Sequence, residues 1–168
     1  RFLIGASVRH FGNKAEEAGY LTFAESRTRP FSSNEFNATD TGKRTTNQYS
    51  AFIDVDVLDN LFWTTKVYFN DFDDRRFVKF SANVSQQERV SKEKHYGVLS
   101  TLTYRPTVPF LHDFAIETGT DIQFQENKSD RYLTNQRVQA SQTRGQDFNF
   151  NIYGAYIQTI LKPLESLK

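Results

Sequence analysis

The chain has 168 residues, of which 21 are Lys or Arg and 20 are Asp or Glu, so its formal net charge is +1. This balance gives no reason to expect a nucleic-acid partner, because phosphate binding needs a concentrated excess of basic residues. The chain contains no Cys, which excludes a disulfide framework and any thiolate metal site.

The composition indicates a structure with one apolar face and one wet face. Aromatic residues make up 15% of the chain, yet its mean hydropathy is −0.63. No stretch approaches the roughly 18 consecutive apolar residues of a transmembrane helix, so a β-barrel is the only way in which this chain could span a membrane. Because the first residue is not Met and already lies in a strand-like run, we expect a segment of a longer protein.

Alternation of apolar and polar residues with a period of two predicts β-strands along much of the chain. The alternating segments are residues 2–9, 49–57, 63–70, 96–105, 114–125 and 148–161. In the clearest of them, Phe114, Ile116, Thr118, Thr120, Ile122 and Phe124 share one face, and Ala115, Glu117, Gly119, Asp121, Gln123 and Gln125 share the other. An apolar face backed by charged and amide side chains is typical of a strand between lipid and a wet lumen.

Two other segments add detail to this pattern. Asp54 and Asp56 fall on the inner face of their strand, where a hydrated lumen would tolerate them better than a dry core. The last segment begins with Phe148, Phe150 and Ile152 alternating with Asn149 and Asn151. After Gly154 the alternation becomes ambiguous, and we therefore expect a β-bulge or kink at this glycine.

The connectors fall into two length classes. Short ones are expected at residues 58–61, 106–113 and 163–167, and long polar ones at residues 11–47, 71–94 and 127–146. We expect parts of each long stretch to extend the strands above the membrane. The short connectors recur about every 53 residues, which matches one strand pair with its long loop. We therefore predict an all-β, antiparallel up-and-down transmembrane β-barrel segment of about six long strands, with short periplasmic turns and long extracellular loops.

A soluble β-sandwich or a lipocalin-like barrel is the alternative fold. Strands in such domains usually run to about 5–6 residues. The alternating segments of this chain reach roughly 9–12 residues, which is close to the length of a membrane-crossing strand. Strand length therefore favours the membrane barrel.

Several loose motifs carry a resemblance to a known family. They are residues 62–73 (FWTTKVYFNDFD), 85–90 (SQQERV), 95–97 (HYG), 102–106 (LTYRP), 141–144 (SQTR) and 153–158 (YGAYIQ), with residues 5–11 and 18–20 before them. In these motifs the chain resembles the barrel of TonB-dependent outer-membrane receptors, which import siderophores and other nutrients into Gram-negative bacteria. The resemblance implies a 22-stranded barrel, of which residues 1–168 would be a middle slice.

The resemblance also sets expectations for function and location. It implies a receptor and transporter in the outer membrane that takes up a ferric siderophore or similar nutrient and performs no covalent chemistry. Expected partners are outer-membrane lipid, lipopolysaccharide, the small ligand, and the TonB complex through an N-terminal region that these residues lack. A TonB box, a plug domain and the C-terminal strands are not recognisable in the sequence. A passive porin-like or other outer-membrane barrel is the alternative, and a soluble β-barrel or sandwich binding protein comes after it.

No group of residues predicts an active site or a cofactor. His10, His95 and His112 are far apart and lack metal-ligand spacing, and Ser7 with His10 matches no hydrolase pattern. Asp71, Asp73 and Asp74 could offer oxygen ligands to calcium, but an acidic strand end that faces water is the favoured interpretation. We expect no enzyme activity, no cofactor and no bound metal.

Loop residues are the candidate ligand contacts. The candidates are Arg75, Arg76, Arg131, Tyr132 and Arg137. Basic and aromatic loop side chains could meet an anionic metal chelate, although a solvated loop or contact with lipopolysaccharide phosphates explains them equally well. The inner-face residues Asp54, Asp56, Glu117, Asp121 and Gln123 are expected to line the lumen or contact a plug.

Overall fold

The computed structural model describes residues 1–164 and places them in one antiparallel sheet of six strands in the order β1-β2-β3-β4-β5-β6. The strands are β1 (Phe2–Glu16), β2 (Thr41–Leu58), β3 (Leu61–Val78), β4 (Gln86–Tyr104), β5 (Asp113–Asn135) and β6 (Val138–Lys162). A short helix, α1 (Phe23–Thr28), and a 3₁₀ turn (Glu35–Asn37) lie between β1 and β2. The predicted all-β, up-and-down arrangement of about six long strands is confirmed.

The register of the strands gives the sheet two distinct faces. Residues paired across antiparallel strands point to the same side of the sheet. Tyr49 is paired with Phe69, Phe69 with Tyr96, and Tyr96 with Phe124. We call the side of the sheet that carries these four residues the aromatic face, and the other side the mixed face.

A continuous line of rings crosses the aromatic face. Neighbouring ring centroids lie 6.1, 6.4, 5.3 and 6.2 Å apart along Tyr49, Phe69, Tyr96, Phe124 and Tyr153. Cross-strand aromatic contacts of this kind stabilise the strand pairing. We call these five residues the aromatic row.

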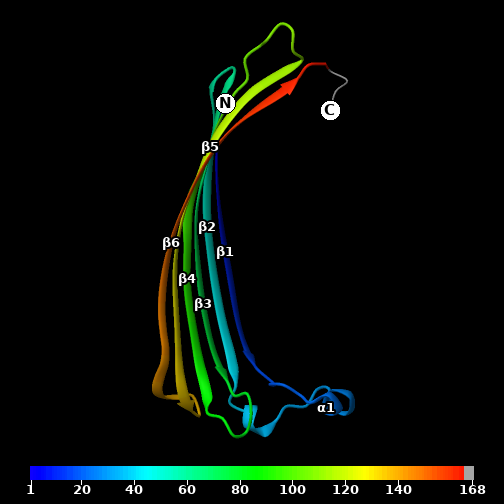
Figure 1. The fold of residues 1–168 in the computed structure, drawn as a ribbon, viewed down its shortest axis with the longest axis vertical. Helices are drawn as coiled ribbons and strands as arrows, with labels where there is room; N and C mark the ends of the chain where they lie inside the picture. Colours follow the sequence, from blue (N-terminus) through cyan, green and yellow to red (C-terminus); the bar gives the residue numbers. More distant parts are fainter. Residues whose placement is uncertain (165–168) are drawn as a thin grey trace.

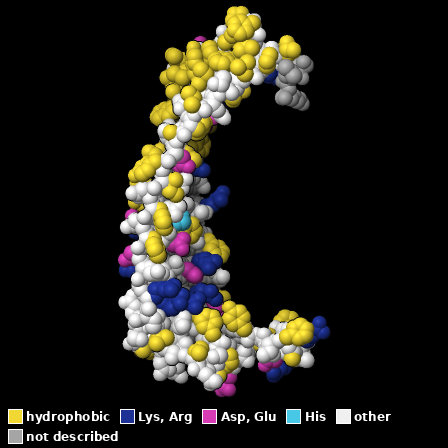
Figure 2. Space-filling view, in the orientation of Figure 1, with side chains coloured by type: hydrophobic (Ala, Val, Ile, Leu, Met, Phe, Trp, Pro, Cys, Tyr) yellow, Lys and Arg dark blue, Asp and Glu magenta, His cyan; other side chains and the backbone are white. Residues whose placement is uncertain are grey.

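The aromatic face changes character at the aromatic row. Toward the end of the sheet that holds the β2–β3 turn, it carries residues such as Val67, Val98 and Ile122. On the other side of the row, the next positions are Asp71, Lys94 and Glu126, which are paired with one another. The apolar and charged parts of this face therefore meet at the same level on neighbouring strands. Figure 2 shows apolar side chains gathered over the upper part of the molecule, and Lys and Arg side chains lower down.

Glycines on the mixed face accept aromatic rings from the adjacent strand. A Cβ atom at Gly119 would lie 2.3 Å from the ring of Tyr156, and one at Gly97 would lie 2.8 Å from the hydroxyl of Tyr68. These close approaches are possible only without a side chain at the glycine, and they hold rings flat on the sheet. A hollow of about 770 Å³ lies on this face over β1–β3, beside Tyr68.

In residues 1–164, no second layer of helices or strands covers the sheet. Within the described residues, the only buried hydrophobic side chains are Val78 and Ala115. The strands are consecutive and the sheet stays open, so β1 and β6 are both edges. No helix among residues 1–164 is long and apolar enough to cross a membrane.

The connections partly correct the expected contrast in loop length. Those at the end with the β2–β3 turn are short, at residues 59–60 and 105–112, as expected. At the opposite end, only residues 17–40 form a long connection, because the β3–β4 and β5–β6 connections are residues 79–85 and 136–137. The expected length of two of the three long connections is therefore wrong. Most of residues 71–94 and 127–146 extend the strands, as expected for parts of them, because cross-strand pairing satisfies the backbone there as well as water would. Figure 1 shows these long strands. The expected connector at 163–167 lies mostly outside the described residues.

The expected irregularity at Gly154 is also absent. Gly154 pairs with Asp121 in unbroken register, and a Cβ atom there would make only ordinary contacts, at 3.7 Å or more. The register shifts instead between Arg131 and Tyr132 and between Leu133 and Thr134. Regular pairing places Phe148, Phe150 and Ile152 on the mixed face, opposite Asn127, Gln125 and Gln123.

Candidate functional site

Four arginines form a line across the mixed face. Arg76 is paired with Arg89, Arg89 with Arg131, and Arg131 with Arg144, so that β3, β4, β5 and β6 each contribute one. We call these four residues the arginine row. Like charges placed directly opposite one another destabilise a sheet, so the row needs either a countercharge or a function to explain it.

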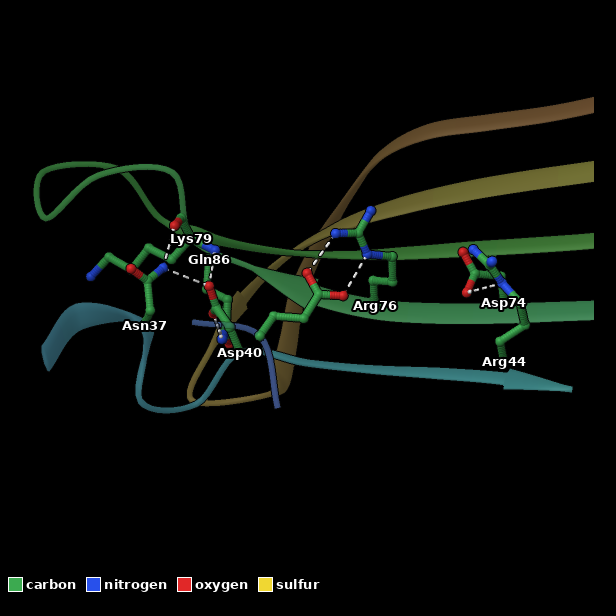
Figure 3. Close-up of polar contacts among 8 residues, drawn as sticks. Asn37, Asp40, Arg44, Asp74, Arg76, Lys79 and Gln86 are labelled. Carbon is green, nitrogen blue, oxygen red and sulfur yellow. Dashed lines mark hydrogen bonds and ion pairs between the residues drawn. The ribbon is translucent and has the colours of Figure 1, made fainter. Parts of the chain in front are cut away.

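One member of the arginine row has a carboxylate partner. Arg76 donates from Nε to Oε1 of Glu17 at 2.8 Å and from Nη2 to Oε2, in a bidentate pair (Figure 3). The hydrogen bond to Glu17 raises the pKa of Arg76. Glu17 begins the long connection after β1, so this contact also holds that connection against the mixed face.

Arg89 occupies the most constrained position in the row. Its Nε is buried and has no hydrogen-bond partner among the described residues, and its guanidinium carbon lies 5.0 Å from the centroid of the Phe80 ring. Burial lowers the pKa of Arg89, and the charges of Arg131 and Arg76 lower it further. The physical cause is the cost of holding a partly desolvated cation beside other cations.

Arg131 and Arg144 add positive charge without neutralisation. In the described part of the chain, neither they nor Arg89 have an Asp or Glu within ion-pair distance. A pocket of about 200 Å³ opens between the arginines and the next row of the same face, where Ser91 and Ser129 are paired. The pocket's lining also includes Asp74 and Asp130, which form ion pairs with Arg44 at 3.4 Å and with Lys128 at 3.9 Å. The pocket therefore still offers the guanidiniums of Arg89 and Arg131 without a carboxylate partner, beside two serine hydroxyls.

A buried polar cluster fixes the connections at this end of the sheet. Oδ2 of Asp40 accepts hydrogen bonds from the backbone N–H of Lys79 at 2.7 Å and from Nδ2 of Asn37 at 2.8 Å, and its Oδ1 accepts one from Nε2 of Gln86 at 2.8 Å. Oε1 of Gln86 in turn accepts from the hydroxyl of Thr134 and the backbone N–H of Arg137. Figure 3 shows Asp40 between Asn37, Lys79 and Gln86. Together with the contacts of Gln86, these hydrogen bonds tie three connections together.

The structure separates the five predicted contact residues. Arg76 and Arg131 belong to the arginine row, whereas Arg75 lies on the aromatic face and forms an ion pair with the fully buried Glu88. Tyr132 is on that same face, opposite Glu88. Arg137 lies in the β5–β6 turn with φ of 70°, and its Nε donates to the backbone oxygen of Thr39 at 2.8 Å, which anchors the turn.

Asp71, Asp73 and Asp74 of β3 do not point toward a common site. Asp71 and Asp73 point to the aromatic face, while Asp74 points to the mixed face and forms an ion pair with Arg44 at 3.4 Å. Among residues 1–164, no group of three His, Cys, Asp or Glu side chains could hold a metal ion. His10 instead contacts Asn47 through Nδ1 at 2.7 Å.

Arg89, Arg144 and Glu17 were not identified as candidates from the sequence. Arg76 lies six residues before the centre of the β3–β4 connection and Arg89 seven residues after it. Arg131 lies five residues before the β5–β6 turn and Arg144 seven residues after it. This near-symmetric spacing predicts that the arginines of each hairpin lie opposite each other. The prediction can be made only when the position of each turn is known. The expected long loops at 71–94 and 127–146 concealed it.

Comparisons with known proteins leave the family open. No family model, no curated protein and no solved structure matches this chain. The resemblance to TonB-dependent receptors therefore stays a prediction.

Proposed function

We propose that the chain is part of the β-barrel of an outer-membrane receptor that imports a ferric siderophore or similar nutrient in the manner of TonB-dependent transporters. The observation that carries the proposal is the aromatic face, with its apolar band and the aromatic row along one border. Outer-membrane barrels present such a band to lipid and flank it with aromatic residues at the interfaces.

The dimensions of the band support this assignment. Tyr96 and Tyr104 share the aromatic face of β4, and the segment from one to the other contains nine residues. A tilted strand that crosses a membrane has about 9–11 residues. On the neighbouring β3, Trp63 lies near the second border, opposite Leu102.

The charged part of the aromatic face fits the membrane surface. Beyond the aromatic row, Lys94 of β4 is paired with Asp71 of β3. Lys92 is paired with Asp73 in the same way. Lysines at this level would meet the phosphates of lipopolysaccharide, and the abrupt change at Tyr96 would mark the headgroup border.

The open sheet supports the idea of a slice. A membrane cannot accommodate unpaired sheet edges in its hydrocarbon core, because each unsatisfied backbone group costs several kcal/mol there. The six strands would therefore be continued by others into a larger closed barrel, as the resemblance implies. The mixed face would then line the lumen, where Asp54, Glu117 and Asp121 can stay hydrated.

Two adjacent residues of β4 provide the test. Val98 lies on the aromatic face and Leu99 on the mixed face, and their exposed fractions are 38% and 40%. Val98→Arg should lower the free energy of unfolding in lipid by about 1–2 kcal/mol. Val98 lies between the border at Tyr96, where a basic residue costs about 0–1 kcal/mol, and the bilayer midplane, where it costs about 2–4 kcal/mol. Leu99→Arg, facing water beside Asp121, should cost much less. Urea titration of the intact protein in liposomes measures both, and equal losses would exclude a lipid-facing aromatic face.

Import is tested separately from membrane insertion. A passive porin would show the same asymmetry between Val98→Arg and Leu99→Arg. Uptake of the nutrient by cells should stop when TonB is removed, because an importer of this class depends on that complex. Uptake that continues unchanged would contradict TonB-dependent import and would indicate another class of outer-membrane barrel.

A further inference from the structure

The arginine row is the strongest feature of the molecule that membrane insertion does not explain. It lies on the mixed face, away from the apolar band. We propose that Arg76, Arg89, Arg131 and Arg144 form a binding site for an extended oligoanion, a ligand whose carboxylates or phosphates repeat along its length and lie across the strands. This inference rests on the proposed function and names the ligand class for the same lumen.

The spacing of the row argues for an extended ligand. Consecutive members come from adjacent strands, and adjacent strands are about 4.8 Å apart, so four arginines span about 14 Å. A compact anion would contact two neighbouring guanidiniums and leave the others without a partner. An oligomer with one anionic group per unit can place a group at each arginine.

The charge of the row argues for an anion with several negative groups. Glu17 neutralises Arg76, and the other three arginines have no carboxylate partner among residues 1–164. The buried Nε of Arg89 is a donor without an acceptor. A ligand with several anionic groups would relieve the repulsion between the aligned cations.

The chemistry of the row matches carboxylate and phosphate. The planar guanidinium presents paired donors that bind either group in bidentate geometry. Ser91 and Ser129, beside the row in the same pocket, add hydroxyl donors. Phe80 under Arg89 holds that guanidinium in place, which reduces the ordering cost of binding.

The position of the row argues against lipid as its partner. Arg76 is seven residues beyond Phe69 of the aromatic row, which corresponds to about 23 Å along the strand. The side chain of Arg76 also points to the mixed face, whereas Lys92 and Lys94 lie on the aromatic face. Lipopolysaccharide phosphates at the barrel's outer surface would therefore meet Lys92 and Lys94, and the arginine row would face a ligand entering the lumen.

The experiment is isothermal titration calorimetry with the intact protein in detergent micelles. Tetragalacturonate and tripolyphosphate are the two extended probes, and they separate a carboxylate source from a phosphate source. Citrate is the compact probe, and a neutral tetrasaccharide reports binding that does not depend on charge. The double variant Arg89→Gln/Arg131→Gln tests the row, and Lys92→Gln/Lys94→Gln removes the same charge from the aromatic face of the same end.

We expect at least one extended probe to bind more tightly than citrate. The variant Arg89→Gln/Arg131→Gln should weaken that binding at least tenfold, while Lys92→Gln/Lys94→Gln should change it less than twofold. Arg89→Lys keeps the charge but loses the bidentate fork, and it should weaken binding by an intermediate factor.

Three results would overturn the proposal. They are equal weakening by the two double variants, binding of citrate or the neutral sugar as tight as that of the extended probes, and no binding of either extended probe. Each can occur in a protein that passes the Val98→Arg and Leu99→Arg test, so failure of the oligoanion site and failure of the membrane barrel are distinguishable.

Discussion

At the scale of single residues, buried polar groups organise the end of the sheet that carries the arginine row. Asp40 and Glu88 are at most 1% exposed, and each has several polar contacts. A buried carboxylate is tolerated only when its oxygens accept hydrogen bonds or pair with a cation. These contacts hold the short β3–β4 and β5–β6 connections in defined positions, and so they also hold the strand ends that carry the arginines.

Asp40→Asn tests this role. The amide replaces an acceptor oxygen with a donor that would face either the backbone N–H of Lys79 or Nε2 of Gln86. A buried group left unsatisfied costs about 1–3 kcal/mol, so residues 79–86 should exchange their amide hydrogens faster by one to two orders of magnitude. Hydrogen-exchange mass spectrometry checks this. Asp59→Asn, at the exposed β2–β3 turn, is the control, and unchanged exchange in Asp40→Asn would contradict the assigned role.

Helix α1 depends on the ionised form of one carboxylate. The Thr22 hydroxyl and backbone N–H donate to Glu25 in a capping box, and these hydrogen bonds lower the pKa of Glu25. A lowered pKa means that the cap stabilises α1 fully above the ordinary pKa of Glu and loses this effect as the pH falls through the lowered value. NMR chemical shifts of residues 23–28 should move toward random-coil values in that acidic range. Glu25→Gln should show little such change with pH, and identical pH profiles would refute the dependence.

At the scale of elements, ring-over-glycine contacts shape the mixed face of the sheet. Tyr156 of β6 lies over Gly119 of β5 and donates from its hydroxyl to Oε1 of Glu117 at 2.9 Å. Gln158 donates to the same oxygen at 3.0 Å. The ring therefore links a packing contact to a polar one, and it holds β6 to β5 near their end.

Gly119→Ala should displace the Tyr156 ring and its hydrogen bond to Glu117, because a Cβ atom at Gly119 would lie 2.3 Å from that ring. Overpacking of this kind costs about 1–3 kcal/mol, and the melting temperature of the intact protein should fall accordingly. Gly154→Ala is the matched control on the neighbouring strand, because its Cβ would meet Asp121 at an ordinary 3.7 Å. Equal melting temperatures for the two variants would show that the close approach at Gly119 is unimportant.

At the scale of the whole molecule, a single open sheet leaves both faces and both edges uncovered. β1 and β6 each have only one neighbouring strand. The 15 residues of β1 and the 25 of β6 thus present long rows of unpaired backbone groups. Long exposed edges template pairing with other chains.

Residues 1–168 expressed alone should therefore self-associate in aqueous buffer. The driving forces are the unpaired edges and the apolar band of the aromatic face, including Val8 and Ile157, which are 70% and 75% exposed. Light scattering should report large particles in buffer and smaller ones in detergent micelles, which cover the band. A monodisperse monomer in buffer would contradict this prediction.

The sequence by itself determined the strand-forming segments and the side to which their side chains point. Alternation with a period of two is a local property, and the pairing of Tyr49 with Phe69 and of Tyr96 with Phe124 confirms the faces assigned to these segments. It failed at the start of β6, where Phe148, Phe150 and Ile152 form the apolar set but lie on the mixed face, because pairing with β5 decides which set faces which side. It also failed at Gly154 and in the length of two connections, because polar residues extend a paired strand as readily as they form a loop. Only the tertiary structure decided the cross-strand register. Register depends on contacts between distant residues, and it alone aligned Arg76 with Arg89, Arg131 and Arg144 and placed Arg75 on the opposite face.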